Sequence, residues 1–258
     1  MTNFETITDV KSLFKLYQNK KINILILGGN KGDGVIYYGA RNLMSKNNIK
    51  FLEILSLDKL DNLEENELFI YGCGGYCKFY NNSINKLKNK INNFKKVFIL
   101  PSTIDCSIKK VHNFINHLGP NILVFCREKT SYNHVIKSIK YKNNVRLDND
   151  LAFNGDYTKF FFDKTDINKN NLLIALRKDI ESLKNWNISQ FSNDISNGSW
   201  KQYEEFINEI NTYSKVITDR AHVAIVASLL NKEVYILPDG YYKVKAIYEY
   251  SLKNKFNV

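Results

Sequence analysis

The sequence is poor in the residues that build disulfide-rich, zinc-binding and membrane-spanning proteins. Its 258 residues include four cysteines, at 73, 77, 106 and 126, and no second pair with zinc-ligand spacing follows the first. No stretch approaches the roughly 18 continuous apolar residues of a membrane span. The first residues also lack the charged start and apolar run of a signal peptide. The sequence therefore predicts no disulfide framework, no metal site and no transmembrane segment, and we expect a cytoplasmic protein.

Acidic residues are outnumbered, with 26 Asp and Glu against 37 Lys and Arg, which gives a net charge of +11. The lysines are scattered among asparagines rather than gathered into basic blocks, which argues against a nucleic-acid partner. A positive field is compatible with an anionic substrate, because it raises the local concentration of that substrate. The hydrophobic fraction of 44% and aromatic fraction of 13% predict a chain that is folded throughout.

Short apolar, β-branched runs that end in turn-forming or charged residues alternate with longer amphipathic stretches, a pattern typical of parallel α/β folds. The predicted strands are 22–27, 68–71, 97–100, 122–125, 172–176, 216–217 and 234–237. The polar stretch 159–171 is interpreted as a linker, which predicts one domain over residues 1–165 and a smaller one over 166–258. A single continuous sheet is the alternative. Ligands are expected at the carboxyl ends of the strands.

The first predicted strand runs into a glycine-rich turn, Gly28-Gly29-Asn30-Lys31-Gly32-Asp33-Gly34, followed by a predicted helix. Backbone amides and a helix N-terminus converge there, which suits an anionic or hydroxyl-rich ligand. The glycine spacing fits neither a dinucleotide fingerprint nor a phosphate loop. Asp33 is either a helix cap or a functional residue, and the sequence leaves both open.

Arginine is scarce beside lysine: the chain has Arg41, Arg127, Arg146, Arg177 and Arg220. Three of them, Arg127, Arg177 and Arg220, lie at or just beyond predicted strand ends. A guanidinium there can bind a carboxylate or phosphate through two hydrogen bonds. The alternative is a structural ion pair, for example Arg127 with Glu128 or Arg177 with Asp179.

The segment from Thr218 to His222 is the strongest local signal, because a predicted strand end leads directly into an apolar helix. Thr218 or Asp219 is predicted as the N-cap, which places Arg220 and His222 in the first helical turn. The helix dipole favours an anion at this end.

With these residues in place, the sequence resembles the polysaccharide pyruvyltransferase family over nearly its whole length. The resemblance rests on ordered motifs at residues 29–33, 125–131, 150–153, 174–177, 218–222 and 239–245. It implies an α/β fold of two facing Rossmann-like domains with parallel sheets, of the GT-B type, with 1–165 on the acceptor side and 166–258 on the phosphoenolpyruvate side. It also implies transfer of a pyruvyl group from phosphoenolpyruvate to a sugar of a glycan, forming a pyruvate ketal.

The resemblance also assigns residues. It implies that phosphoenolpyruvate is bound by Arg127, Arg177, Arg220, Ala221 and His222, and the acceptor by Asn30, Gly32 and Asp33. His222 is expected to protonate or neutralise the leaving phosphate, and Asp33 to take the acceptor's proton, with Asp219, Glu128 and Asp150 as alternatives. No metal or further cofactor is implied.

Two departures from the family pattern keep other functions open. Family members usually have leucine where this chain has Ala221, and they are usually longer. One alternative is a GT-B-like glycosyltransferase that uses a nucleotide sugar; the other is a binding protein that has kept the fold but lost turnover. The oligomeric state has no sequence signal.

Overall fold

The computed structural model describes residues 4–63, 67–72, 76–78, 84–160, 171–182, 194–237, 241–256 and 258. Its internal contacts divide the chain into two compact units. The first comprises Met1–Gly28 and Ala40–Leu151, and the second comprises Gly29–Gly39 and Ala152–Val258. Among the described residues, no helix is both long enough and apolar enough to cross a membrane.

The first unit is built on a parallel sheet, which has six strands within the described residues, in the order β2-β1-β3-β4-β5-β6. The strands are β1 Lys21–Leu25, β2 Lys50–Ile54, β3 Glu67–Ile70, β4 Lys96–Ser102, β5 Ile122–Cys126 and β6 Val145–Leu147. Because β1 lies between β2 and β3, the strand order reverses at β1, and its carboxyl end opens into the Gly28-Gly29 turn. Open α/β sheets bind ligands at such a reversal.

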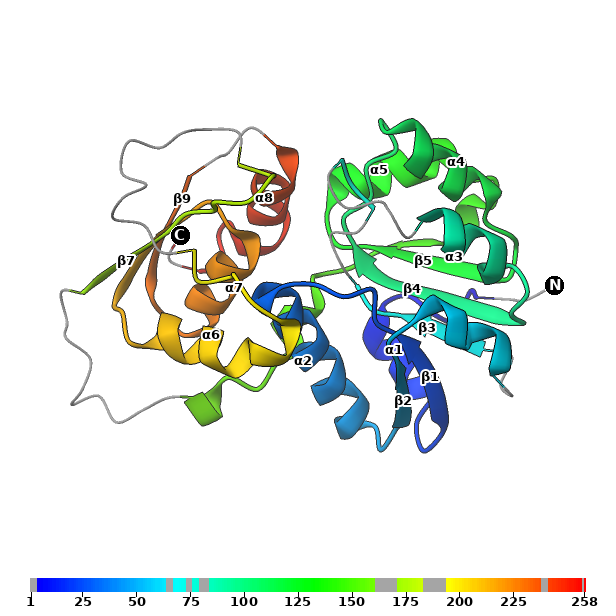
Figure 1. Cartoon of the computed structure of the whole chain (residues 1–258), viewed down its shortest axis with the longest axis horizontal. Helices are drawn as coiled ribbons and strands as arrows, with labels where there is room; N and C mark the ends of the chain where they lie inside the picture. The colour runs from blue at the N-terminus through cyan, green and yellow to red at the C-terminus, as the bar shows by residue number, and fades with distance from the viewer. Residues whose placement is uncertain are drawn as a thin grey trace. The chain divides into compact units, whose positions relative to one another are not determined.

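Helices cover both faces of this sheet, so its central strands are buried on both sides. Figure 1 shows α3 Ile84–Ile91, α4 Lys109–His117 and α5 Lys129–Ser138 gathered over β3 to β5. Alternate strand residues such as Ile70 and Ile99 pack with these helices. On the opposite face, Phe69 packs against Phe14 of α1, which spans Val10–Leu16. This two-sided burial explains the continuous apolar runs in the sequence.

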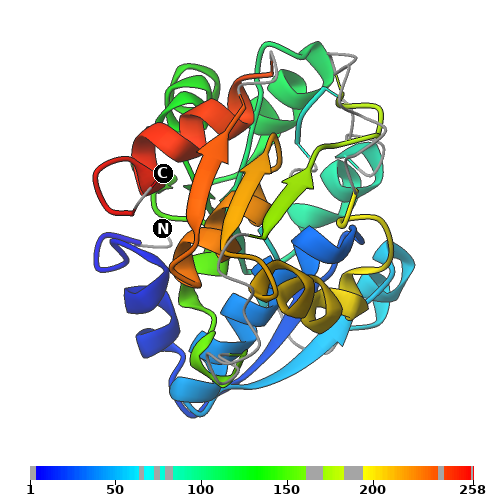
Figure 2. The same ribbon diagram turned by 90° about the vertical axis from the view of Figure 1, so that its left-hand side faces the viewer.

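The second unit contains a smaller parallel sheet with the order β7-β8-β9, formed by Leu172–Ala175, Lys215–Thr218 and Glu233–Ile236. Figure 2 shows the three strands side by side and pointing the same way. Its helices are α6 Tyr203–Asn211, α7 Ala221–Leu229 and α8 Tyr242–Ile247, the last followed by a π-helical turn, Tyr248–Leu252. Helix α7 is buried along nearly its whole length, as its apolar sequence requires.

Helix α2, Lys31–Lys46, belongs to both units. Its first half groups with the second unit, where Val35 and Tyr38 enter the core. The Tyr38 ring stacks on Tyr203, and its hydroxyl donates to the carbonyl of Asp156 at 2.5 Å. Short 3-10 turns complete the described chain at Leu57–Asn62, Lys142–Asn144, Leu151–Asn154, Thr158–Phe160 and Trp200–Gln202.

The predicted α/β class with parallel sheets is confirmed, and each predicted strand is present with its ends shifted by at most two residues. The described strands form two sheets, not the single continuous sheet that was the alternative. Strands β2 and β6 were not predicted, because β2 is largely exposed and β6 is very short. The predicted boundary between 165 and 166, and most of the proposed linker, lie outside the described residues.

Candidate active site

The turn after β1 is closed by reciprocal hydrogen bonds between two predicted site residues. Asn30 Oδ1 accepts from the backbone amides of Gly32 at 2.9 Å and Asp33 at 3.3 Å, and Asp33 Oδ2 accepts from the Asn30 amide at 3.0 Å. The positive φ angles of Gly28 and Gly29, 86° and 138°, allow the chain to enter the helix at this point. Asp33 therefore does act as a helix cap, one of the two roles that the sequence left open.

The carboxyl ends of β7 and β8 are joined by side-chain hydrogen bonds. Thr218 Oγ1 donates to the carbonyl of Ala175 at 2.8 Å and accepts from the Arg220 amide at 3.0 Å. Asp219 Oδ1 accepts from the Arg177 amide at 2.9 Å. These bonds bring Arg177 and Arg220 next to each other, as expected for residues that follow neighbouring parallel strands.

The predicted start of helix α7 was wrong by one or two residues. Arg220, not Thr218 or Asp219, is the N-cap, and its side chain makes no capping hydrogen bond. The side chains of Thr218 and Asp219 are used instead between the strand ends. Arg220 therefore precedes the first turn, whereas Ala221 and His222 lie within it.

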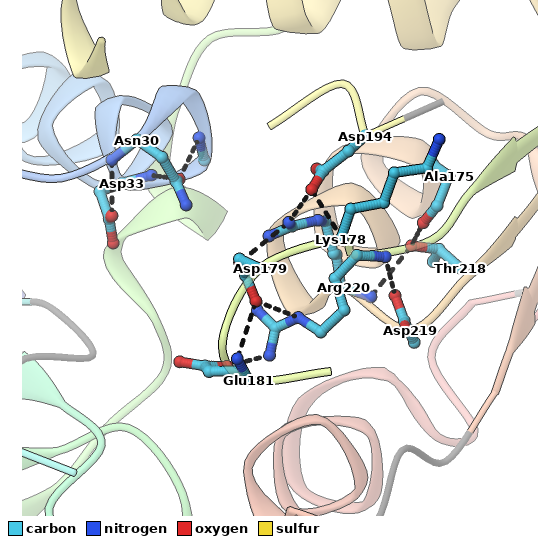
Figure 3. A network of polar contacts seen from close by, with 12 residues as sticks. Asn30, Asp33, Ala175, Lys178, Asp179, Glu181, Asp194, Thr218, Asp219 and Arg220 are labelled. Carbon is cyan, nitrogen blue, oxygen red and sulfur yellow. Dashed lines mark hydrogen bonds and ion pairs between the residues drawn. The ribbon is translucent and has the colours of Figure 1, made fainter. Parts of the chain in front are cut away.

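Arg177 and Arg220 lie in a network of ion pairs, drawn in Figure 3. Nη2 of Arg220 is 3.0 Å from Asp179 Oδ2 and 2.6 Å from Asp194 Oδ2. Nε of Arg177 is 3.5 Å from Asp179 Oδ1, and its Nη1 pairs with Glu181. The pairing of Arg177 with Asp179 is the structural alternative that the sequence suggested.

Glu181 connects this network to α8. Its carboxylate is fully buried and accepts from Lys243 Nζ at 2.7 and 2.9 Å. Burial by itself raises the pKa of Glu181, but the charges of Lys243 and Arg177 outweigh it and lower the pKa to about 2. Glu181 is thus held as a carboxylate between two cations.

His222 lies directly against the glycine turn, so two separate predicted motifs meet within the second unit. A Cβ atom placed on Gly32 would be 2.9 Å from His222 Nδ1 and 3.2 Å from His222 Cβ. Glycine at position 32 therefore leaves room for the imidazole. The residues assigned to the acceptor, Asn30, Gly32 and Asp33, belong to the same contact unit as Arg177, Arg220 and His222.

Arg127 lies elsewhere, in the first unit, and is 1% exposed. Its Nη1 pairs with Asp150 Oδ2 at 2.7 Å, and its Nε donates to Thr103 Oγ1 at 2.8 Å. The suggested partner Glu128 is instead the N-cap of α5, where its carboxylate accepts from the Ser131 amide at 2.9 Å. The Arg-Glu-x-x-Ser motif thus connects β5, α5 and the segment before Leu151.

The sequence reasoning did not identify Glu181, Asp194 or Lys243 as site residues. Glu181 did have a sequence signal, because Arg177, Asp179 and Glu181 are spaced two residues apart directly after a predicted strand. Asp194 comes from a distant segment with no local pattern, and Lys243 lies in the last family motif, 239–245, to which the sequence reasoning assigned no site role. Residues 239 and 240, the first two of the last family motif, lie outside the described residues. Within the described part of the chain, no group of His, Cys, Asp and Glu is arranged to hold a metal ion.

The fold and this geometry define a parallel α/β protein with two buried arginines and a histidine at the strand ends of its second unit. Residues 30–240 match the polysaccharide pyruvyl transferase family. Because the match spans most of the chain, the chain belongs to this family, which supports a role in polysaccharide pyruvylation. None of the curated proteins matches the chain significantly.

Solved structures add to the evidence on the fold. The crystal structure of a functionally uncharacterized protein from Klebsiella pneumoniae is 29% identical and has a TM-score of 0.77, covering 99% of this chain and 97% of that one. Staphylococcus aureus MnaA with UDP gives 11% identity, a TM-score of 0.49, and coverages of 84% and 79%. UDP-GlcNAc 2-epimerase from Neisseria meningitidis with UDP-GlcNAc is 10% identical and has a TM-score of 0.46, covering 88% of this chain and 85% of that one. The last two likenesses are too weak to support an argument about ligands.

Proposed function

We propose that this protein transfers a pyruvyl group from phosphoenolpyruvate to a sugar of a glycan or glycan precursor and forms a pyruvate ketal. The observation that carries the proposal is the convergence of Arg177, Arg220 and His222 at the carboxyl ends of β7 and β8. Phosphoenolpyruvate has a carboxylate and a phosphate. Two guanidinium groups and the amide end of α7 suit these two groups.

The donor side of the reaction is assigned to the second unit. Arg177 and Arg220 would bind the two acidic groups, and the amides of Ala221 and His222 in the first turn of α7 would add hydrogen bonds. Protonation of the enol CH₂ carbon makes it a methyl group and leaves an oxocarbenium-like centre at the neighbouring carbon. His222 would protonate or neutralise the phosphate as its bond to that carbon breaks. Arg127 remains a donor contact implied by the family resemblance.

The acceptor side is assigned to the glycine turn, where Asn30, Gly32 and Asp33 would contact the sugar. Two sugar hydroxyls must each add to the same carbon and each lose a proton to form the ketal. Asp33 is the proposed base, with its Oδ2 already accepting from the Asn30 amide. The contact between Gly32 and His222 supports this assignment, because it brings the acceptor turn next to the proposed acid.

The proposal is tested by incubating the protein with phosphoenolpyruvate and candidate glycans, and by following phosphate release and the new ketal methyl signal by NMR. We expect His222→Asn to keep donor binding and to lower turnover by about 10²- to 10⁴-fold. His117→Asn, an exposed histidine of the first unit, is the matched control. Calorimetry should detect binding of phosphoenolpyruvate. Binding of a nucleotide sugar in its place would replace the proposal with the glycosyltransferase alternative, and binding of donor without turnover on any glycan would favour a non-catalytic role.

A further inference from the structure

The carboxylate of Asp179 lies between the two arginines assigned to the donor. Its Oδ1 is 3.5 Å from Nε of Arg177, and its Oδ2 is 3.0 Å from Nη2 of Arg220. Figure 3 shows Asp179 beside Arg220 in this network. One aspartate thus contacts both guanidinium groups, which is the arrangement expected of a bound anionic ligand.

Asp179 leaves hydrogen-bonding capacity of the arginines unused, because its 3.5 Å ion pair with Nε of Arg177 is not a hydrogen bond. Among the described residues, Nε of Arg177 and Nε of Arg220 are buried without a hydrogen-bond acceptor. Buried N–H groups without an acceptor are unfavourable, and a carboxylate has only two oxygens to offer. A ligand with a tetrahedral phosphate or with two acidic groups has additional oxygens for these donors.

Asp179 is also the member of this group with access to water. Its side chain is 26% exposed, compared with 8% for Arg177 and 6% for Arg220. It belongs to an exposed bend in which Ile180 is 64% exposed. If Asp179 moved away from the arginines, it would lose these two contacts and the hydrogen bond from the Glu181 amide at 3.0 Å. Water would then hydrate its carboxylate and offset part of this loss.

We propose that Asp179 occupies the anion position of the donor site and that the donor's carboxylate or phosphate displaces it. Asp179 then acts as a specificity-determining residue. A simple monocarboxylate offers the arginines nothing that Asp179 does not already supply, whereas a phosphate-bearing ligand brings more charge and more acceptor oxygens. The site would therefore discriminate against pyruvate and favour phosphoenolpyruvate. This inference rests on the proposed function for the identity of the donor.

Calorimetric titrations of wild type, Asp179→Asn and Asp179→Ala with inorganic phosphate, pyruvate and phosphoenolpyruvate test this inference. Removing one competing charge-assisted contact should tighten phosphate and phosphoenolpyruvate binding about tenfold and should make pyruvate binding measurable. Asp156→Asn is the matched control, because Asp156 belongs to the same unit and its Oδ1 accepts from the Thr158 amide at 3.2 Å. Its anion affinities should equal those of the wild type. Thermal unfolding without ligand checks that each variant is folded.

The outcomes separate this inference from the proposed function. If both Asp179 variants are folded and bind phosphate no more tightly than the wild type, Asp179 is not a competitor and the inference fails. Weaker binding would instead identify Asp179 as a residue that positions the arginines. If both variants gain phosphate affinity but no glycan is pyruvylated, the inference stands and the proposed function fails.

Discussion

The buried ion pair between Arg127 and Asp150 allows a sharp test of what the Arg-Glu-x-x-Ser motif does. Arg127 is 1% exposed, Asp150 is fully buried, and Nη1 lies 2.7 Å from Oδ2. Substituting Asp150 with alanine would remove the carboxylate that pairs with this guanidinium in the core of the first unit, where Nε also donates to Thr103 Oγ1. A guanidinium does not deprotonate in proteins, so Arg127 would stay charged and the buried charge would lack its carboxylate partner.

The expected loss of stability follows from this burial. Removing one partner of a buried pair typically costs about 3–5 kcal/mol. For a unit of this size, each kcal/mol lowers the melting temperature by about 2–4 °C, so Asp150→Ala should melt about 10 °C below the wild type. The double variant Arg127→Met with Asp150→Leu removes both charges and fills similar volume. It should recover most of the loss, because hydrophobic replacement of a buried pair is often neutral.

The assay is urea and thermal unfolding of the wild type, Asp150→Ala, Arg127→Met, Asp150→Leu and the double variant, with the last three and the wild type analysed as a double-mutant cycle. A loss below about 1 kcal/mol in Asp150→Ala would refute the reasoning, since it would mean that water or another group solvates the guanidinium. Calorimetry on the folded double variant then tests the donor contact assigned to Arg127. Unchanged phosphoenolpyruvate affinity would limit Arg127 to a structural role, whereas lost affinity would support the family assignment.

Three further predictions concern other contacts. Gly32→Ala should push the imidazole of His222 away from its position and lower turnover about tenfold or more at nearly unchanged stability, measured by transfer kinetics and by unfolding. Glu181→Gln should weaken the dependence of the free energy of unfolding on pH in acid. The depressed pKa of Glu181 contributes about 3 kcal/mol at neutral pH, and this contribution is lost as the pH falls from about 4.5 through about 2. Ser131→Ala should cost about 1–3 kcal/mol, measured by urea unfolding, because it leaves the buried Ile104 amide without its acceptor at 2.7 Å.

Each of these three has a distinct control or contradicting result. A Gly32→Ala protein with wild-type turnover would show that the imidazole position does not matter for the reaction. A Glu181→Gln protein whose acid-unfolding curve keeps the wild-type slope between pH 5 and pH 2 would assign that slope to other carboxylates. Ser138→Ala, which removes a half-buried hydroxyl bonded to the His134 carbonyl and 3.1 Å from His112 Nδ1, should cost less stability than Ser131→Ala. Equal losses in the two serine variants would contradict the special role of Ser131.

The sequence predicted the sheet strands well where burial is two-sided, since runs such as 122–125 have no other stable location than a covered sheet. It failed at β2, where Phe51 and Leu52 are apolar but exposed and only Ile54 is buried, and at the start of α7. There, Thr218 and Asp219 are good capping residues by type, but tertiary hydrogen bonds to Ala175 and Arg177 take their side chains.

The two arginines of the site were more predictable than most of the charged groups that pair with them. Arg177 and Arg220 stand out because arginine is rare in this lysine-rich chain and both follow strands. Their carboxylate partners come from a bend at Asp179 and from Asp194. The sequence suggested Asp179 as a partner of Arg177, two residues away. Asp194 has no distinguishing signal, because aspartate is common in loops and only the fold places this one beside a guanidinium.

The division of α2 between the two units has a consequence for any attempt to take the protein apart. A fragment that begins at Ala152 would lack Val35 and Tyr38, and Tyr38 alone supplies ring contacts to Tyr157, Phe160 and Tyr203. We expect such a fragment to fold only when a peptide covering residues 29–46 is added back. The N-terminal and C-terminal halves of the chain are therefore not independent folding units. A chimaera that takes its second unit from a related protein would have to take helix α2 from that protein as well as the C-terminal segment.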